Sequence, residues 1–505
     1  MGGSDRATLP ETMSAMSRLV LLANATALPW SEVPEWPVEE FIRVVGDDLS
    51  GGARLSALFG VADGERVRLV AVLAFDADST LGVGRSEPFT GGFPALSATH
   101  AQGHLFEREI WEQHGVMPEG HPWLKPVRRT EGEAPARGEF FRVAGGEVHE
   151  VAVGPVHAGV IEPGHFRFQC AGEEVLHLEI ALGYQHRGIE EALVGGPHRA
   201  TMMQMETIAG DTSIAHGTAY AHLLEALGES EAPLRAQWLR SLALELERLA
   251  NHTGDLGALA GDVAFLPTSA ACGKLRGDFL NLSAELCGNR FGRGLVRPGG
   301  CRGDLDGARA VVLADWLERA MADTAQAVTW LWDAAAVRAR FENVGRVFQS
   351  QAVEIGMVGP AARACGLVRD VRYDHPSGWY RFAQVPVTVW PDGDVFARAR
   401  VRALEIQRSG EFLKAQLSEP PEGEVRGEVG GMAPEALAVA LVEGWRGEVC
   451  HVVITDSFGR FRRYKISDAS FHNWTGLSLA MRGTAISDFP ICNKSFSLSY
   501  CGFDL

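Results

Sequence analysis

Cysteine is scarce in this sequence, and no two cysteines have the Cys-x-x-Cys spacing of common metal sites. The 505 residues include eight cysteines, at positions 170, 272, 287, 301, 365, 450, 492 and 501. Self-contained zinc and iron–sulfur sites are usually built from such pairs, and disulfide-rich domains from many closely spaced cysteines. The sequence therefore predicts neither kind of site. We expect the eight thiols to be reduced and mostly buried, as in a cytoplasmic protein.

Long apolar runs and a basic surface are missing as well. No segment approaches the ~18 consecutive apolar residues of a membrane-spanning helix, and the short run Leu19–Ala23 follows Asp5 and Glu11, which argues against a secretory signal. The net charge is −17, from 47 basic and 64 acidic residues. This balance opposes binding to nucleic acid and offers no polybasic membrane anchor. If the protein acts at a membrane, we expect other subunits to attach it.

The rest of the composition is that of a folded globular protein. Hydrophobic residues make up 46% of the chain and charged residues 22%, so a large core is available without disulfides or metals. The length of 505 residues suggests more than one domain. Changes in patterning predict an N-terminal extension (1–35), a small α/β domain (36–130), a linker (131–149) and a mainly helical domain with small antiparallel sheets (150–505). The predicted fold class is α+β.

Periodicity predicts the main elements. The largely apolar segment Val67–Phe75 (VRLVAVLAF) is typical of a buried strand, and a helix is expected over Ala98–Gly115, ending at the glycine. Apolar and polar residues alternate over 143–182, which predicts short antiparallel strands. Leucines recur at helical spacing in Pro233–His252, and Val449–Thr455 has the composition of a strand.

Two groups of motifs resemble known families. FEREIWEQHGVMPEGHPWLKPVR (106–128) resembles the signature of the 30 kDa subunit of complex I. From Gly154 onward the chain resembles the 49 kDa subunit of complex I and the large subunit of membrane-bound [NiFe]-hydrogenases, closest to the formate hydrogenlyase and hydrogenase-4 branch. The motifs of this second group follow the family's order: GPVHAGVIEPGHFRF (154–168), GYQHRGIEE (183–191), GDTSIAHGTAYA (210–221), ELERLANH (245–252), GNRFGRGLVRPGG (288–300), EGWRGE (443–448) and SFHNW (470–474).

The sequence differs from the hydrogenase large subunits at the positions that would hold a [NiFe] centre. Hydrogenases of this family bind the metals through two Cys-x-x-Cys pairs, because nickel and low-spin iron need anionic sulfur donors. Ala209 and Thr212 stand at the positions of the first pair, and alignment on Asp504 puts Ser499 and Gly502 at those of the second. The sequence therefore predicts no [NiFe] centre and no cofactor bound by this chain. It is similar to energy-converting hydrogenase-related proteins, which keep the architecture without these cysteines.

The quinone pocket of complex I is altered too. The family's tyrosine in the segment equivalent to 207–212 is replaced by Gly210, and its opening-loop histidine corresponds to Ile161 or Glu162. Quinone chemistry in the complex I geometry is therefore not expected, and entry of a quinone into a remodelled pocket is left open.

Four residues are candidates for the site itself: Glu162, His165, Asp211 and Arg446. The resemblance implies that Glu162 and His165 lie at a buried cavity, where a carboxyl of raised pKa can relay protons. The alternative is a glutamate that accepts hydrogen bonds in the turn at Pro163-Gly164. Arg446 matches the arginine over the hydrogenase metal, and it could pair with Asp211 or bind an anionic or carbonyl-bearing substrate. Asp211 could instead be a helix N-cap.

A proton path toward the membrane arm is predicted from polar residues of the helical segments: His216, Glu245, Arg248 and His252. The last three share one helix face, because they are three and four residues apart. A solvated or internally paired face is the alternative.

The resemblance implies a subunit of a membrane-bound, ion-translocating oxidoreductase complex. A small subunit similar to the 20 kDa subunit of complex I would carry a [4Fe–4S] cluster and contact Tyr184, His186 and Arg187. Other expected partners are a ferredoxin-like iron–sulfur subunit and antiporter-like and complex I-like membrane subunits, with this chain on the cytoplasmic side. Two alternatives are left open: a non-catalytic scaffold, and a hydrogenase or quinone-reducing subunit.

Overall fold

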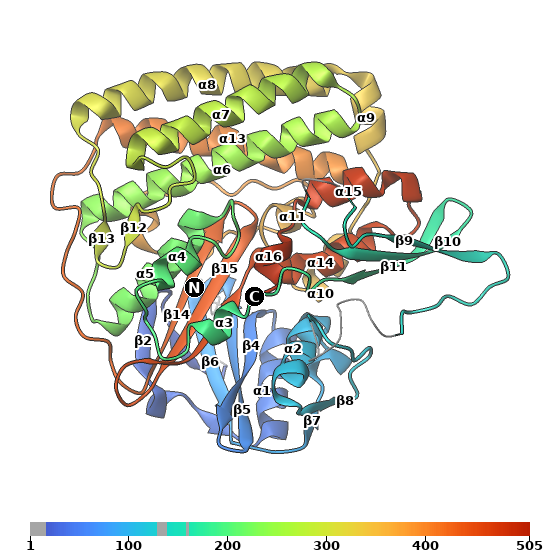
Figure 1. Ribbon diagram of the computed structural model, residues 1–505, viewed down its shortest axis with the longest axis vertical. Coiled ribbons are helices and arrows are strands. Elements are labelled where there is room, and N and C mark those ends of the chain that lie inside the picture. Colours follow the sequence, from blue (N-terminus) through green and yellow to red (C-terminus); the bar gives the residue numbers. More distant parts are fainter. Residues whose placement is uncertain (1–16, 129–138, 158–160) are drawn as a thin grey trace, which may run out of the picture.

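The N-terminal and C-terminal regions of the chain meet in two sheets that pack face to face. The computed structural model describes residues 17–128, 139–157 and 161–505. In Figure 1 an N-terminal sheet (blue) lies against a C-terminal sheet (orange), and four long helices lie side by side at the far end. Helices and small, largely antiparallel sheets occur together along the chain, which confirms the predicted α+β class.

The first sheet is buried on both faces. It contains β1 (Val20–Leu22), β3 (Glu35–Trp36), β4 (Arg54–Asp63), β5 (Arg66–Phe75) and β6 (Thr80–Ser86), with helices α1 (Val38–Ser50) and α2 (His104–His114) beside it. The strand order is β1-β6-β5-β4, and β3 adds to β6 in parallel. Alternate residues of β5 join different cores: Leu69 and Ala71 pack in the core that contains α1, whereas Val70 and Val72 pack against the second sheet. A strand buried on both faces needs a nearly continuous apolar run such as Leu69–Phe75, so the predicted strand Val67–Phe75 is confirmed.

The second sheet lies at the centre of the molecule. It contains β2 (Thr26–Pro29), β14 (Ala436–Gly444), β15 (Gly447–Thr455) and β16 (Phe461–Ser467), antiparallel in the order β16-β15-β14-β2. In β14, Leu437 and Val439 face the first sheet. The small residues Ala438 and Ala440 join the other core, on the side of helix α5 (Ser213–Leu227). Side chains this small let α5 approach the sheet closely, and the turn between β14 and β15 lies near its first residues.

Four long helices form the far layer in Figure 1. They are α6 (Leu234–Asp262), α7 (Leu266–Cys287), α8 (Gly307–Asp333) and α13 (Val395–Ser418). Helix α6 contacts α7 and α13, and α8 contacts the same two helices. The helix predicted over Pro233–His252 is therefore confirmed as part of α6, and its leucine stripe is buried.

The remaining elements are short. The strands predicted over 143–182 are confirmed as the antiparallel sheet of β9 (Val148–Val153), β10 (His165–Ala171) and β11 (Glu174–Ala181). The C-terminal tail contributes α14 (Ala469–Ala480), α15 (Phe489–Phe496) and α16 (Tyr500–Phe503). The others are α3 (Ile189–Ala192), α4 (Thr201–Met205), α9 (Ala335–Phe341), α10 (Gln349–Glu354), α11 (Gly359–Arg363), α12 (Val371–Asp374), β7 (Gly92–Pro94), β8 (Met117–Glu119), β12 (Val296–Arg297) and β13 (Gly300–Cys301).

The helix expected over Ala98–Gly115 begins later than predicted, at His104. The carboxylate of Glu107 accepts hydrogen bonds from the N–H groups of Leu96 and Ser97, at 2.5 and 3.2 Å. These bonds hold the 3-10 turn Leu96–Ala98, and a second 3-10 turn, Ala101–Gly103, comes directly before the helix. The helix ends at Gly115 as predicted, with φ of 70°.

The predicted N-terminal extension contains two strands. β1 pairs with β6, and β2 pairs with β14, more than 400 residues further along the chain. Strands of three and four residues carry too little local pattern to be seen in the sequence. The domain boundaries stay predictions, and residues 1–16 and 131–138 lie outside the described ranges. Within those ranges, no helix is long and apolar enough to cross a membrane.

Candidate functional site

Two segments far apart in the sequence meet beside the turn of the β14–β15 hairpin. Arg446, in that turn, links both of them. Its Nη1 donates a hydrogen bond to Thr212 Oγ1 at 3.1 Å, and its Nε donates to the carbonyl of Ser497 at 2.5 Å. The structure therefore brings together the segments that the alignment assigns to the two missing cysteine pairs.

Arg446 and Asp211 form a bidentate ion pair. The Nη1 and Nη2 atoms donate to the two carboxylate oxygens at 2.5 and 2.9 Å, and the guanidinium lies 3.9 Å from the centroid of the Trp445 ring. Burial alone would raise the pKa of Asp211, but the charge and hydrogen bonds of Arg446 outweigh it and leave that pKa below its ordinary value. The pairing offered by the sequence is confirmed. The N-cap interpretation of Asp211 is wrong, because Thr212 is the N-cap of α5.

The hairpin turn that carries Arg446 is held tightly. Gly447 has φ of 129°, and a Cβ atom there would lie 2.7 Å from Gly359 Cα. Only glycine fits such a close approach of two backbones. The position of Arg446 is thus set by the backbone as well as by its own bonds.

The residues at the aligned cysteine positions do not fit a nickel–iron centre. Ala209 and Gly502 have no side-chain donor, and Thr212 and Ser499 offer neutral hydroxyls where thiolates are needed. The Ser499 hydroxyl already accepts from the N–H of Gly502 at 2.9 Å, and a Cβ on Gly502 would lie 2.9 Å from the carboxyl carbon of Asp468. Among the residues with described placement, no group of three or more His, Cys, Asp or Glu side chains is arranged to hold a metal ion.

Glu162 is linked to this region by hydrogen bonds to the C-terminal segment of the chain. Its Oε2 accepts hydrogen bonds from the N–H groups of Tyr500 and Cys501, at 3.1 and 3.4 Å. The thiol of Cys501 also interacts with the backbone N–H of Gly210. Glu162 therefore lies one contact away from the segment that carries Asp211.

His165 does not join the cluster of Asp211 and Arg446. It is the first residue of β10, and its Nε2 lies 3.3 Å from the Nε of Arg167. Side chains two residues apart on a strand share one face, so His165 points with Arg167 rather than toward the tail. Burial and the charge of Arg167 lower its pKa.

A buried hydrogen-bond chain leads from the site into the second sheet. It runs from Asp468 to His216 (3.2 Å), on to His451 (3.0 Å) and then to Tyr464 (2.8 Å). All four side chains are at most 1% exposed. Burial alone would raise the pKa of Asp468, but His216 and Arg446 outweigh it and leave that pKa at about 2. Imidazole and hydroxyl groups can both donate and accept, so such a chain can pass a proton.

Sequence reasoning singled out His216 and missed the other three members of this chain. The one available signal concerns Asp468, which begins the Asp-x-Ser pattern of an N-cap and does cap α14 through the N–H of Ser470. Nothing local marks His451 and Tyr464, because the pairing of β15 with β16 and the packing of α5 on this sheet bring them beside His216.

The other predicted proton-path residues belong to a set that we call the buried ion array. Its arginines are Arg248, Arg363 and Arg372, its carboxyls are Glu245, Asp370, Glu405 and Glu443, and His252 completes it; each is at most 3% exposed. The contacts include Arg372–Glu245 at 3.0 Å, Arg372–Asp370 at 2.6 Å, Arg363–Glu405 at 2.8 Å, Arg363–Glu443 at 2.8 Å and His252–Glu405 at 2.9 Å. The helix face is internally paired, so the solvated alternative is wrong.

Glu247 is a second buried carboxyl beside the site, and the sequence reasoning missed it. Its Oε2 accepts from the N–H of Ile214 at 2.8 Å, and its Oε1 has no hydrogen-bond partner within the described ranges. Burial first, and then the charge of Asp211, raise its pKa to about 8. Both carboxyls line one cavity of about 10 Å³. Neighbouring carboxyls with opposite pKa shifts are typical of sites that move protons.

The loop predicted to face an iron–sulfur partner is fixed to both site segments. Arg187 donates to the carbonyls of Thr207 and Ile208, each at 2.9 Å. The carboxylate of Asp504 accepts from the N–H groups of Gly183 and Gln185 at 2.8–2.9 Å. Tyr184 and His186 lie in the same loop, where burial and the charge of Arg128 lower the pKa of His186. Contact of these residues with a partner stays a prediction.

Comparison with known proteins agrees with this arrangement. Residues 262–435 match the family described as "Respiratory-chain NADH dehydrogenase, 49 Kd subunit". One of the NADH-quinone oxidoreductase subunits of Anaeromyxobacter sp. (strain K) is 31% identical over 337 residues, which cover 64% of this chain and 87% of that protein. Formate hydrogenlyase subunit 5 of Escherichia coli (strain K12) is 28% identical, over 78% of this chain and 74% of its own length.

A third relative spans nearly the whole chain. Hydrogenase-4 component G of Escherichia coli (strain K12) is 26% identical, over 97% of this chain and 88% of its own length. The motif order, the meeting of the two segments and these similarities all point the same way. The chain belongs to the family of the 49 kDa subunit of the respiratory-chain NADH dehydrogenase and is an oxidoreductase subunit related to complex I and to membrane-bound hydrogenase large subunits.

Proposed function

We propose that this chain is the peripheral-arm large subunit of a membrane-bound, ion-translocating oxidoreductase complex. Electrons from a [4Fe–4S] cluster in a neighbouring small subunit reach the region of Glu162, Asp211 and Arg446, without a [NiFe] centre. The observation that carries the proposal is the bidentate pair of the buried Arg446 and the half-buried Asp211, at the place where the two site segments meet. The names of the relatives, which include an NADH-quinone oxidoreductase and a hydrogenase component, support a redox complex.

The side chains of this region suit a role in proton-coupled electron transfer. Negative charge that arrives near Asp211 favours the uptake of a proton, because opposite charges attract strongly at low dielectric. Glu247 holds a proton at neutral pH, and the chain from Asp468 through His216 can conduct one. Glu245, Arg248 and His252, in the buried ion array, extend the polar path away from the site. The proton movement drives translocation of protons or cations by membrane subunits.

The proposed assembly follows from the same reasoning. The loop of Tyr184, His186 and Arg187 faces the small [4Fe–4S] subunit, and a ferredoxin-like iron–sulfur subunit delivers electrons to it. Antiporter-like and complex I-like subunits hold the complex at the inner face of the membrane, with this chain on the cytoplasmic side.

One observation favours a second candidate, a non-catalytic scaffold that couples or assembles other subunits. Arg446 and Asp211 neutralise each other, and the cavity beside Asp211 has only about 10 Å³, which is just room for one water molecule. A scaffold would retain the fold while its site carries no chemistry. The two candidate functions predict different effects of site substitutions on redox turnover.

The first experiment is the nickel and iron content of the complex purified from its native host. We expect no nickel, and iron only at the level of the iron–sulfur partners, because the hydroxyls of Thr212 and Ser499 are poor ligands for nickel. Inductively coupled plasma mass spectrometry per copy of this chain measures both. Stoichiometric nickel would make the protein a hydrogenase and refute the proposal.

The variant Glu162→Gln separates the redox subunit from the scaffold. If Glu162 transfers protons, its amide is expected to slow redox turnover on the order of tenfold or more, because an amide neither takes up nor releases a proton. The glutamine keeps an oxygen for the N–H groups of Tyr500 and Cys501, so folding is preserved. Glu150→Gln, on the neighbouring β9, is the matched control. Equal turnover in both variants would favour the scaffold.

A further inference from the structure

Two adjacent cavities, which share part of their lining, lie beside the buried ion array. The outer cavity has a volume of about 460 Å³, and the inner one has about 20 Å³. They share five lining residues: His222, Gln237, Arg240, Ser377 and Gly378. The inner cavity has room for one water molecule and the outer one for several.

Polar atoms without partners face the inner cavity. Within the described part of the chain, His222 Nδ1 and Thr218 Oγ1 have no hydrogen-bond partner, although their residues are only 8% and 3% exposed. Leaving such groups unpaired is costly unless water reaches them. Burial lowers the pKa of His222 to about 4, so at neutral pH its ring has one nitrogen that donates and one that accepts.

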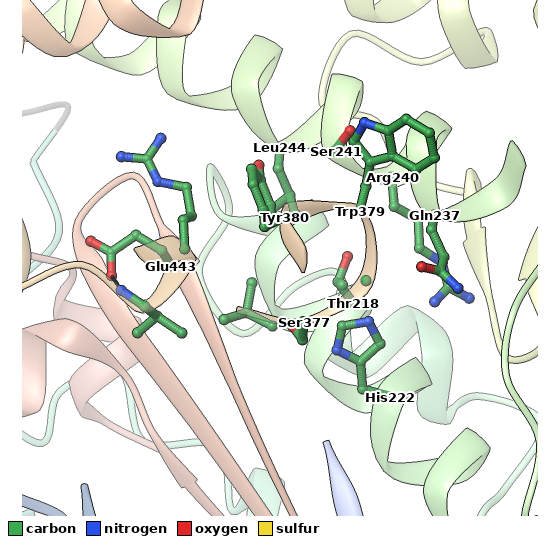
Figure 2. A pocket seen from close by; sticks show the side chains of 14 residues that line it. Thr218, His222, Gln237, Arg240, Ser241, Leu244, Ser377, Trp379, Tyr380 and Glu443 are labelled. Atoms are coloured by element: carbon green, nitrogen blue, oxygen red, sulfur yellow. Dashed lines mark hydrogen bonds between the residues drawn. The ribbon is translucent and has the colours of Figure 1, made fainter. Parts of the chain in front are cut away.

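The inner cavity ends on the buried ion array. Glu443, Arg372 and Tyr380 line it. Figure 2 shows Glu443 at one side of the cavity, Thr218 and His222 at the other, and Tyr380 above them. The Tyr380 hydroxyl donates to Glu245 at 2.6 Å.

The array holds one more carboxyl than it holds arginines. Three guanidinium groups are permanently charged, and four carboxyl groups face them. Burial lowers the pKa of His252 to about 4, so the imidazole adds no positive charge at neutral pH. An unpaired charge is expensive in such a buried place, and one proton on a carboxyl removes the excess.

Glu443 is the carboxyl that is best placed to carry this proton. Within the described residues its carboxyl pairs with one guanidinium, that of Arg363 at 2.8 Å, and its Oε2 accepts from the N–H of Val371 at 3.1 Å. Arg248, Asp370 and Arg372 are the other charged groups around it. Burial first, and then the charge of Asp370, raise its pKa. By contrast, Glu245 is paired with both Arg372 and Arg248. Their charges outweigh the effect of burial and lower the pKa of Glu245 to about 2.

We propose that Glu443 is a proton-loading site that exchanges one proton with solvent through the two cavities, by way of His222 and the inner water position. In uptake, an O–H bond of the inner water breaks as an O–H bond forms on the carboxylate of Glu443. That water takes a proton from one ring nitrogen of His222, and the other ring nitrogen takes one from a hydronium ion of the outer cavity, so the net reaction moves one solvent proton to Glu443; release is the reverse. No oxidant or further reactant is needed.

The same hairpin joins this proton site to the candidate site. Glu443 ends the strand that leads into the turn with Arg446, and Arg248 donates to the carbonyls of Glu443 and Gly444 at 2.8 and 3.1 Å. A change of charge on Glu443 therefore acts on the segment that positions Arg446. This coupling role rests on the proposed function, whereas the proton site itself does not.

The proton site is tested by infrared spectroscopy of the purified complex at neutral pH. The carbonyl stretch of a protonated carboxyl is distinct from the bands of carboxylates. We expect Glu443→Gln to remove one such band. Glu448→Gln is the matched control: Glu448 pairs across the hairpin with Glu443, is 2% exposed and is kept ionised by Arg54 at 2.7 Å. Retention of every band in Glu443→Gln would overturn the proposal.

The route is tested by exchange into D2O. The shift of the Glu443 band is expected to slow about tenfold in His222→Phe, because the ring that relays the proton is replaced by an inert one of similar size. His198→Phe, at an exposed position, is the control. An unchanged rate in His222→Phe would exclude the route.

The coupling role is tested by the ratio of ions translocated to electrons transferred. Glu443→Gln is expected to lower this ratio while redox turnover continues. An unchanged ratio, together with loss of the infrared band, would make the proton purely structural. If the wild-type complex shows no redox turnover, the proposed function fails, and the infrared result still stands.

Discussion

Replacing Arg446 by alanine is expected to destabilise the protein by ~1–3 kcal/mol, because Asp211, whose side chain is 33% exposed, would be left half-buried and charged without its partner. The side chain also contacts Trp445, Thr212 and the carbonyl of Ser497, so packing is lost as well. Urea denaturation of the chain measures the effect. The double variant Asp211→Ala with Arg446→Ala is expected to recover part of the loss. If the double variant is no more stable than Arg446→Ala, the ion pair is not the cause.

The same variant is expected to reduce redox turnover of the assembled complex by about 10²–10³-fold, if Arg446 stabilises charge during the reaction. Arg446→Lys is expected to rescue little, since lysine cannot reproduce a bidentate, stacked guanidinium. The matched control is Arg402→Ala. Arg402 pairs with Asp255 at 2.8 Å and is 1% exposed, but it contacts neither Asp211 nor Thr212. Similar turnover per folded complex in the two variants would reduce Arg446 to a structural role.

Glu247→Gln is expected to change how stability depends on pH. The pKa of Glu247 is about 8 in the folded protein and 4.5 in an ordinary environment. Between these values the folded chain holds a proton that the unfolded chain has lost, so the free energy of unfolding falls as pH rises. The fall amounts to on the order of 3–5 kcal/mol over the whole window. Glutamine has no proton to lose, and it can still accept from the N–H of Ile214.

Denaturation midpoints of the two proteins measure this effect. They are expected to be similar near pH 4.5, and the advantage of Glu247→Gln is expected to grow up to about pH 8. The control is Glu245→Gln, two residues away on α6. Glu245 is kept ionised by Arg372 and Arg248, so its amide is expected to be less stable than wild type across that range. A difference between Glu247→Gln and wild type that does not vary with pH would contradict the raised pKa.

Much of the fold could be predicted because its signals are local. Val67–Phe75 is apolar on both faces except at Arg68, and the stripe in Pro233–His252 repeats every three or four residues. The predictions of secondary structure are wrong where contacts with residues distant in the sequence determine the local structure. Glu107 binds two N–H groups of the 3-10 turn Leu96–Ala98, where the sequence pattern predicts the start of a helix, and β2 exists as a strand because β14 pairs with it.

In the candidate site, too, some features could be predicted from the sequence and others depend on contacts between distant residues. The resemblance predicts Asp211 and Arg446 as a pair, and the structure joins them. It also groups His165 with them, three residues after Glu162, yet the strand that begins at His165 turns its side chain away. Glu247 and Glu443 carry no motif, so their properties follow only from what packs around them.

By itself the sequence determined that the chain has an α+β fold, no Cys-x-x-Cys pair and the ordered motifs of its family. These properties depend on residue types, their order and their local spacing. Only the tertiary structure decided which charges are paired and which are not. The excess carboxyl of the buried ion array and the opposite pKa shifts of Asp211 and Glu247 depend on burial and on distances of a few ångströms. Packing sets those distances between residues that lie far apart in the chain.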